Sequence, residues 1–445
     1  MIDVAIIGGG FSGTLLAVNL VRHEGPSALL FERNHKAGLG LAYSTSSNSH
    51  LLNVRAANMS ALPDDPGHFE RWAQAECGAE RTSFVPRATY GRYLNSLLEE
   101  ARAQAPHQLT VHAAEVIGIR PEGEHFQLLF ANGERQQARR VVLATGNLPA
   151  RAPAGLDPAA LGDAYCNDPW EGELMPPAGP DSPVLLIGTG LTAIDAALLL
   201  REAGHGGEIV ALSRRGLIPR VHGAPEPVPP LPEAPAADTL SILRHLRAQA
   251  KKIGWRAAVD QLRPHTQDLW RRMPLAEKQR FLRHARVWWD VHRHRMAPEV
   301  AGQVKHMVAA GDLRVIAGRI LSAERTETGA RLEIQRKDAS TQTLKVGRIV
   351  NCTGPGDVAR SAQPLIRSLL DGGLARPDEL GMGLETDHLG RVIAPDGAPN
   401  SSLFAVGPLT RGSFWETTAV PDIRRQVWSL ARMLSNAHWV GGEGL

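Results

Sequence analysis

The strongest constraint on the fold is a glycine-rich turn between a strand and a helix, a pattern that the chain contains twice. The apolar run Val4–Ile7 predicts a buried parallel strand, and it leads directly into Gly8-x-Gly10-x-x-Gly13, which opens an apolar-periodic helix. The segment Ala28–Glu32 predicts a second strand. Together these segments predict a βαβ unit at the start of the chain.

The first turn matches the fingerprint of dinucleotide-binding folds. Gly8 permits the tight turn, Gly10 lets a pyrophosphate approach the backbone, and Gly13 allows the helix to pack closely on the strand. The helix N-terminus stabilises the phosphates. Glu32 ends the second strand, where its carboxylate accepts hydrogen bonds from ribose hydroxyls and repels a 2′-phosphate. The first unit is therefore expected to bind FAD or NAD.

The second unit repeats this order of elements. Its strand Val184–Ile187 leads into Gly188-x-Gly190-x-x-Ala193, and a second strand follows at Glu208–Leu212. Alanine is an accepted substitute for the third glycine of the fingerprint. The chain is therefore predicted to be an α/β protein with two Rossmann-type domains, one for each dinucleotide.

The second unit ends in a basic pair rather than an acid. Arg214 and Arg215 follow its second strand, and guanidinium groups pair bidentately with phosphate. We therefore expect NADPH in this domain, with a solvated basic strand end as the alternative.

The rest of the 445 residues is organised around these units. We expect the first part of the FAD-binding domain in residues 1–150 and the NADP-binding domain in 183–345. A helical period with almost no strand signal predicts an all-helical insertion in that domain at about 236–310. The strands expected from Arg348 onward predict a return to the FAD-binding domain in 346–445.

Composition excludes several classes of protein. Cys77, Cys166 and Cys352 form no CxxC pair, so neither a disulfide framework, a zinc knuckle nor an adjacent redox dithiol is expected. His292 and His294 lack a third ligand at metal-binding spacing. The net charge of +3 demands no nucleic acid or membrane partner, and no stretch is long enough to span a membrane. A cytoplasmic location is the default expectation.

The predicted insertion concentrates basic residues. At helical spacing, Arg286, Asp290 and Arg293 fall on one face, and Arg295 follows. We expect Arg286, Arg293 and Arg295 to bind a carboxylate or the NADPH phosphates. An ordinary solvated helix with ion pairs is an equally good interpretation.

Two nested nucleotide folds joined by the return strand Ala144-Thr145-Gly146 resemble the flavin-containing and N-hydroxylating monooxygenases. The resemblance implies a cofactor contact for Gly146. In the flavin-containing enzymes an asparagine shortly after the first unit lies over the flavin and meets its C4a-oxygen adduct. The segment around Asn53 is similar in layout, which implies that role for Asn53, whereas a turn cap is the alternative.

Three further segments resemble a bacterial family of FAD/NAD(P)-binding proteins: Gly38–Thr45, His50–Val54 and Trp415–Pro421. Some relatives of this family look like amino-acid N-hydroxylases, including aspartate N-monooxygenases. The resemblance places Gly40 near the isoalloxazine or ribityl chain.

Leu403–Gly407 is similar to a C-terminal flavin motif in which an aspartate follows the glycine. Pro408 takes that position here. Backbone amides near Gly407, or those of the helix expected to begin around Thr418, are then expected to face the flavin.

These resemblances imply an FAD- and NADPH-dependent monooxygenase that N-hydroxylates a small amine or amino acid through a flavin C4a-hydroperoxide. Its partners would be molecular oxygen and a small substrate, with an anionic amino acid as the natural guess, and a homo-oligomer is compatible with the sequence. An NADPH-dependent dehydrogenase or reductase acting on a C–C or C–N bond would use the same motifs. A non-catalytic flavoprotein is a third interpretation, against which the NADP motif argues.

Overall fold

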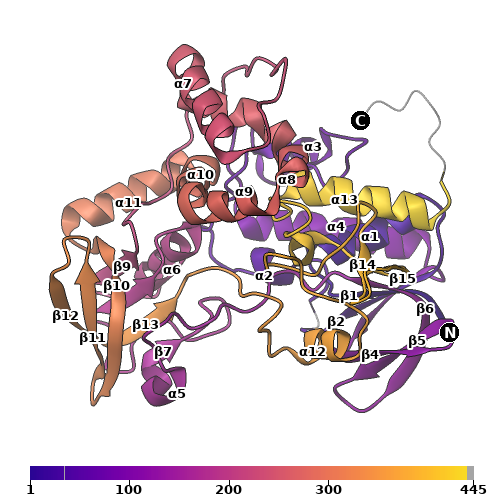
Figure 1. Cartoon of the computed structure of the whole chain (residues 1–445), viewed down its shortest axis with the longest axis horizontal. Coiled ribbons are helices and arrows are strands. Elements are labelled where there is room, and N and C mark those ends of the chain that lie inside the picture. The colour runs from indigo at the N-terminus through magenta and orange to yellow at the C-terminus, as the bar shows by residue number, and fades with distance from the viewer. Residues whose placement is uncertain (35, 438–445) are drawn as a thin grey trace.

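The first sheet is built around β1 (Ile2–Ile7), whose side chains are buried on both faces of the sheet. The structure is a computed structural model that describes residues 1–34 and 36–437 (Figure 1). The strand order is β14-β15-β6-β1-β2-β3, and β4 and β5 extend from β6 as an antiparallel meander. The bounds are β1 Ile2–Ile7, β2 Ala28–Glu32, β3 Leu109–Ala113, β4 Val116–Glu122, β5 His125–Phe130, β6 Arg135–Leu143, β14 Arg391–Ile393 and β15 Pro399–Ala405.

The two ends of the described chain meet in this first sheet. Strand β15 runs parallel to β6, with Leu403 opposite Val141. The helix that follows, α13 (Val420–Leu434), packs beside α1 (Phe11–Arg22) in one apolar cluster. The first domain is therefore made from two segments that are far apart in the sequence.

The second sheet repeats the topology of the first. Its order is β12-β11-β10-β9-β8-β13-β7, so β10-β9-β8-β13 corresponds to β3-β2-β1-β6. The bounds are β7 Tyr165–Cys166, β8 Val184–Ile187, β9 Ile209–Ser213, β10 Leu313–Thr326, β11 Gly329–Arg336, β12 Thr341–Val346 and β13 Arg348–Asn351. The predicted α/β fold with two Rossmann-type units is confirmed.

Strand β13 differs from its expected place. The sequence pattern put the return to the first domain at residue 346, but β13 pairs in parallel with β8 and with β7. It lies next to β8 in the second sheet, in the place that β6 has next to β1 in the first. The first sheet resumes only with β14.

Several helices accompany the sheets. In the first domain they are α2 Gly40–Tyr43, α3 His68–Cys77, α4 Arg87–Gln104 and α12 Pro364–Asp371, and around the second sheet they are α5 Pro158–Leu161, α6 Leu191–Glu202 and α11 Pro298–Ala310. Helix α11 was expected within the insertion. Its residues Val300, Val304 and Met307 instead pack in the core of the second sheet, because α11 is the crossover that leads into β10.

The insertion itself consists of four helices that lie over α13 and beside the first domain (Figure 1). They are α7 Thr239–Leu262, α8 Thr266–Arg272, α9 Leu275–Arg280 and α10 Arg286–Arg293. Their apolar cluster also includes Trp415 from the segment before α13. The indole N–H of Trp270 donates to the carbonyl of Gly412 at 2.8 Å, and the ring of Trp270 stacks on Trp415 with centroids 4.6 Å apart.

Glu416 joins the insertion to the same segment through a buried charge. It is 7% exposed, and its φ of 64° places a non-glycine residue in the left-handed region, which is uncommon. Its carboxylate accepts from the indole of Trp289 at 2.5 Å and from Nε of Arg293 at 3.1 Å. Burial raises the pKa of Glu416, but Arg293 and His294 outweigh it and the net shift is downward. Glu416 is therefore a paired carboxylate that fastens the insertion to the approach of α13.

Replacing Glu416 by glutamine should lower the free energy of unfolding by about 3–5 kcal/mol, because Arg293 is then buried without a counter-charge. Urea unfolding followed by tryptophan fluorescence measures the loss. Adding Arg293→Met should recover part of it. The control is Arg272→Ala, which removes an exposed pair with Asp268 and should cost less than about 1 kcal/mol. Equal losses for the two single variants would show that the buried pair does not hold the insertion.

Candidate functional site

At two of the three glycines of the first turn, nearby backbone atoms leave no room for a side chain. Gly8 has φ 107°, and a Cβ there would lie 2.5 Å from the carbonyl oxygen of Ala144. A Cβ on Gly13 would lie 1.9 Å from the carbonyl oxygen of Gly8. No side chain fits at either position, so β1, α1 and the end of β6 approach as closely as the fingerprint requires.

Gly10 differs because a Cβ there would meet no atom closer than ordinary contact distance. Its nearest prospective Cβ neighbour is Cα of Gly40 at 3.6 Å, which is ordinary contact. Gly10 caps α1 without a side-chain hydrogen bond, so no side chain competes for the first-turn amides. Gly40 has φ 56°, and Gly38 N–H donates to the carbonyl of Gly9 at 2.8 Å. The turn at 38–40 thus lies against the start of α1, where helix N-terminal amides can bind a phosphate.

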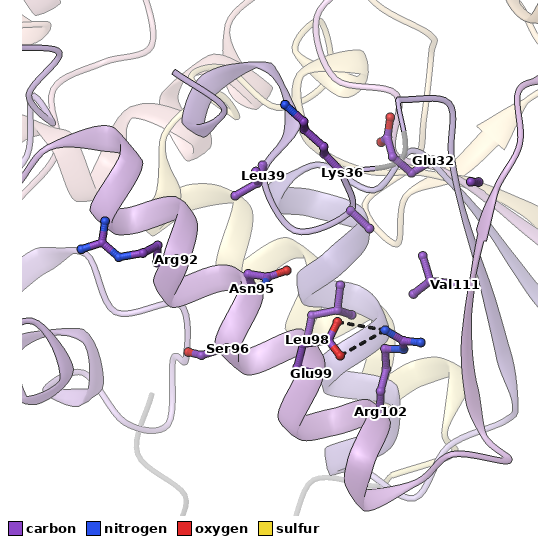
Figure 2. A pocket seen from close by; sticks show the side chains of 12 residues that line it. Glu32, Lys36, Leu39, Arg92, Asn95, Ser96, Leu98, Glu99, Arg102 and Val111 are labelled. Atoms are coloured by element: carbon purple, nitrogen blue, oxygen red, sulfur yellow. Dashed lines mark hydrogen bonds and ion pairs between the residues drawn. The ribbon is translucent and has the colours of Figure 1, made fainter. Parts of the chain in front are cut away.

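Glu32 borders a cavity of about 720 Å³ beside this turn (Figure 2). One carboxylate oxygen accepts from Gly9 N–H at 2.8 Å and the other from Asn34 N–H at 2.9 Å. The walls come from the 36–39 loop, β3 and α4, and include Lys36, Leu39, Val111, Arg92 and Asn95. A cavity that combines apolar walls with polar and charged side chains, next to the first glycine turn, could hold the adenosine end of FAD.

The second turn has the same geometry. Gly188 has φ 121°, and a Cβ there would lie 2.5 Å from the carbonyl oxygen of Cys352, which takes the place of Ala144. No atom lies within 4 Å of a Cβ at Gly190, while Ala193 is buried in the core. In both turns, then, the second glycine is the open one, as a bound pyrophosphate requires.

Arg214 and Arg215 lie on the surface directly after β9. The guanidinium of Arg215 is 5.7 Å from the ring centroid of Trp288 on α10, within cation–π range. Ser213 accepts from Gly216 N–H at 3.0 Å and from the hydroxyl of Thr189. These bonds tie the basic strand end to the second glycine turn.

Asn53 lies where the first domain meets the segment after β9. Its backbone carbonyl accepts from Nε2 of His222 at 3.0 Å, whereas its side-chain amide makes no hydrogen bond to any residue that the structure describes. Burial lowers the pKa of His222 to about 4, so the ring is neutral and carries its proton on Nε2. His222 therefore holds the backbone of Asn53, and the side-chain amide of Asn53 remains available to a ligand.

Gly407 is less available than expected. Its φ is 72°, a Cβ would lie 2.4 Å from the hydroxyl of Ser12, and its N–H donates to Gln426 at 2.8 Å. The alternative was the start of α13, which begins at Val420 rather than around Thr418. Pro421 has no N–H, and the N–H groups of Asp422 and Ile423 donate to the carbonyl of Ala419, so Val420 has the one first-turn amide without a partner among the described residues. Gly146 has φ 74° and open space around it.

The three arginines of the insertion do not share one surface. Arg293 and Arg295 are 8% and 3% exposed, and only Arg286 is half exposed. Arg293 pairs with Glu416, and Arg295 makes a bidentate pair with Asp260 at 2.9 Å for both bonds. Arg286 pairs with Asp290 at 3.3 Å on the surface, so all three charges are balanced within the chain and two of them are buried.

One ion pair that was not anticipated joins the two domains. Arg87 on α4 contacts Asp195 on α6 at 2.7 Å, and His50 contacts the carbonyl of Asp195. Burial raises the pKa of Asp195, and Arg87 opposes the shift. An isolated acid within the apolar run of α6 was the available signal. This pair fixes the second glycine turn relative to the first domain.

Two features are absent from the described residues, a membrane-spanning helix and a metal-binding cluster. No helix there is long and apolar enough to cross a membrane. No group of three or more His, Cys, Asp or Glu side chains in that part of the chain can hold a metal ion.

Known proteins are similar to this chain at the level of its first domain and of its fold. Residues 5–148 match the model of a family described as FAD-NAD(P)-binding, so the first domain is an FAD/NAD(P)-binding domain. An uncharacterized protein from Mycobacterium tuberculosis is 23% identical over 97% of this chain and 95% of its own length. Nitrosuccinic acid synthase npaA from Aspergillus oryzae is 28% identical over 44% of this chain and 32% of its own length.

Solved structures cover nearly the whole chain. An ornithine N-hydroxylase from Kutzneria sp. 744, with FADred, NADP+ and L-orn, has a TM-score of 0.65 at 16% identity over 98% of this chain and 99% of the other. The FAD-bound cadaverine monooxygenase DfoA from Erwinia amylovora has a TM-score of 0.66 at 12% identity, over 98% and 95%. Thioredoxin reductase from Lactococcus lactis has a TM-score of 0.53 at 15% identity, over 98% of each. The chain therefore has the fold of two-dinucleotide flavoproteins, which include N-hydroxylating monooxygenases.

Replacing Gly10 by valine should yield protein without FAD, because the side chain would fill the space where the pyrophosphate approaches α1. The flavin absorbance of the purified protein, divided by its protein absorbance, measures occupancy. Gly302→Val is the matched control, since that glycine of α11 has open space around it and no positive φ. Full flavin content in Gly10→Val would contradict the placement of FAD at this turn.

Proposed function

We propose that the protein is an NADPH-dependent FAD monooxygenase that N-hydroxylates a small amino acid carrying net negative charge. The observation that carries the proposal is the pair of glycine turns, each closed at its first glycine and open at its second, in a chain with the fold of N-hydroxylating flavoproteins. When bound, FAD supplies hydride acceptance and oxygen activation.

In this proposal the protein binds FAD and NADPH and orients them for the reaction. Glu32 and the open face of Gly10 hold the adenosine and pyrophosphate of FAD, and Gly190 with Arg214 and Arg215 holds NADPH. Asn53 presents its unpaired amide to the flavin. The Arg87–Asp195 pair fixes the position of one nucleotide site relative to the other, because it ties α6 directly to α4.

The anionic substrate is supported by one relative and by local charge. The name of the Aspergillus relative gives a product with two carboxyl groups and an oxidised nitrogen. An amino dicarboxylate is the corresponding amine. Arginine side chains gather around the insertion and α13, where such an anion would be stabilised.

A second candidate is an NADPH-dependent reductase that acts on a C–C or C–N bond without inserting oxygen. The likeness to thioredoxin reductase shows that the same fold also occurs in a reductase. Cys166 and Cys352 are both buried, and burial raises the pKa of each thiol, so a thiol-based electron route is not supported.

The deciding experiment measures NADPH oxidation, oxygen consumption and hydroxylamine formation together, for acidic, neutral and basic amino acids. We expect all three to proceed in a one-to-one ratio with an acidic amino acid. Because N-hydroxylation needs the neutral amine, turnover should rise with pH toward the pKa of the substrate amine. NADPH oxidation that consumes substrate but no oxygen would favour the reductase.

Replacing Arg214 and Arg215 together with alanine should raise the KM for NADPH at least about tenfold more than the KM for NADH. Each charge-assisted hydrogen bond to the 2′-phosphate is worth about 1.5–3 kcal/mol. The control is Arg319→Ala, an exposed arginine on β10 of the same domain. An equal rise in the KM for NADPH and in the KM for NADH would show that these arginines do not bind the 2′-phosphate.

A further inference from the structure

A second cavity of about 440 Å³ lies between the insertion and α13, and neither glycine turn contributes to it. Arg263 and Gln267 line it from the insertion. Thr417, Asp422 and Arg425 line it from the segment that leads into α13 and from α13 itself. The cavity is thus bounded by the insertion and by the helix whose first turn is expected to face the flavin.

The charge of this cavity is unbalanced. Arg263, Arg424 and Arg425 line it, against the single carboxylate of Asp422. The positive end of the α13 dipole adds to the excess. Three guanidinium groups beside one carboxylate repel one another unless an anion joins them.

Several polar atoms here are buried without a hydrogen-bond partner among the described residues. They include Nη2 of Arg263, Nε of Arg424 and Oδ2 of Asp422. Arg263 and Asp422 form only a long ion pair, at 3.7 Å, and Arg424 uses its Nη1 to donate to Ser60 at 2.7 Å. Buried polar groups are nearly always hydrogen-bonded, so each unpaired atom indicates a missing partner.

Arg263 is also held in an unfavourable environment. Burial lowers its pKa, and so does the positive charge of Arg293, while Asp422 and Glu416 oppose the shift. Arg293 is itself committed to Glu416. An added carboxylate would therefore stabilise Arg263 without competing with a stronger internal pair.

We propose that this cavity is the subsite for the carboxylates of a small amino dicarboxylate, with Arg263 and Arg425 binding the carboxylates and Asp422 accepting from the amino group. This proposal rests on the proposed function, which requires an anionic amino acid. It assigns substrate binding to two arginines that donate no hydrogen bond to a carboxylate of the described residues, whereas Arg293 and Arg295 are hydrogen-bonded to Glu416 and Asp260.

The test is isothermal titration of the oxidised, FAD-loaded protein with succinate, which has the two carboxylates but no amine. Succinate should bind, and Arg425→Ala or Arg263→Gln should weaken its binding at least about tenfold. Arg425 is exposed, so its replacement does not disturb the core. The control is Arg271→Ala, an exposed arginine of α8 outside the cavity, which should bind succinate as the wild type does.

Two further ligands examine the chemistry of the cavity. Succinamide, which is uncharged, should not bind, and sulfate should bind more weakly than succinate. Asp422→Asn should weaken binding of L-aspartate while leaving that of succinate within a factor of about two, because only the amino acid carries the ammonium group. Unchanged succinate binding in both arginine variants would overturn the proposal, as would equal binding of sulfate.

Activity measurements separate this proposal from the proposed function. If succinate binding depends on Arg263 and Arg425 but no amino acid is hydroxylated, the subsite stands and the monooxygenase assignment fails. If an acidic amino acid is hydroxylated with the same KM in the wild type and in both variants, the function stands and the subsite is overturned.

Discussion

Close approach of backbone to backbone at two glycines is the constraint on which the rest of the structure depends. Gly8 faces the carbonyl of Ala144, and Gly188 faces the carbonyl of Cys352, each at a distance that excludes a Cβ. This approach brings the closing strand of each unit against its glycine turn. The following helix then begins with open amides, and the second glycine alone has space before it. The binding geometry follows from that packing.

The predictable parts of the fold are those that depend on short, continuous stretches of sequence. The glycine turns, their strands and the basic pair after β9 lie within short windows, and the residues in each window were enough to assign them. Strand β13 was misassigned because a short apolar strand carries no mark of which sheet it joins. Helix α11 was grouped with the insertion because a crossover helix and an inserted helix share the same period.

The candidate site was harder to predict because its charges are matched over long separations. Arg293 pairs with a carboxylate 123 positions away and Arg295 with one 35 positions away. A run of arginines therefore indicated a binding face, whereas folding buried two of the three. Arg263 had no such pattern around it, and only the cavity beside α13 distinguishes it from the other arginines of the insertion.

The interleaving of the two sheets has a consequence for the order in which the protein can form during synthesis. All strands of the second sheet come from the continuous segment 165–351, whereas the first sheet needs residues 2–143 together with β14 and β15. The second domain can fold as a unit while the rest of the chain is still being synthesised. The first must keep residues 141–143 of β6 unpaired on one edge until residues 399–405 emerge, and exposed edges invite wrong pairing. Chaperone dependence and aggregation on truncation should therefore concentrate in the first domain.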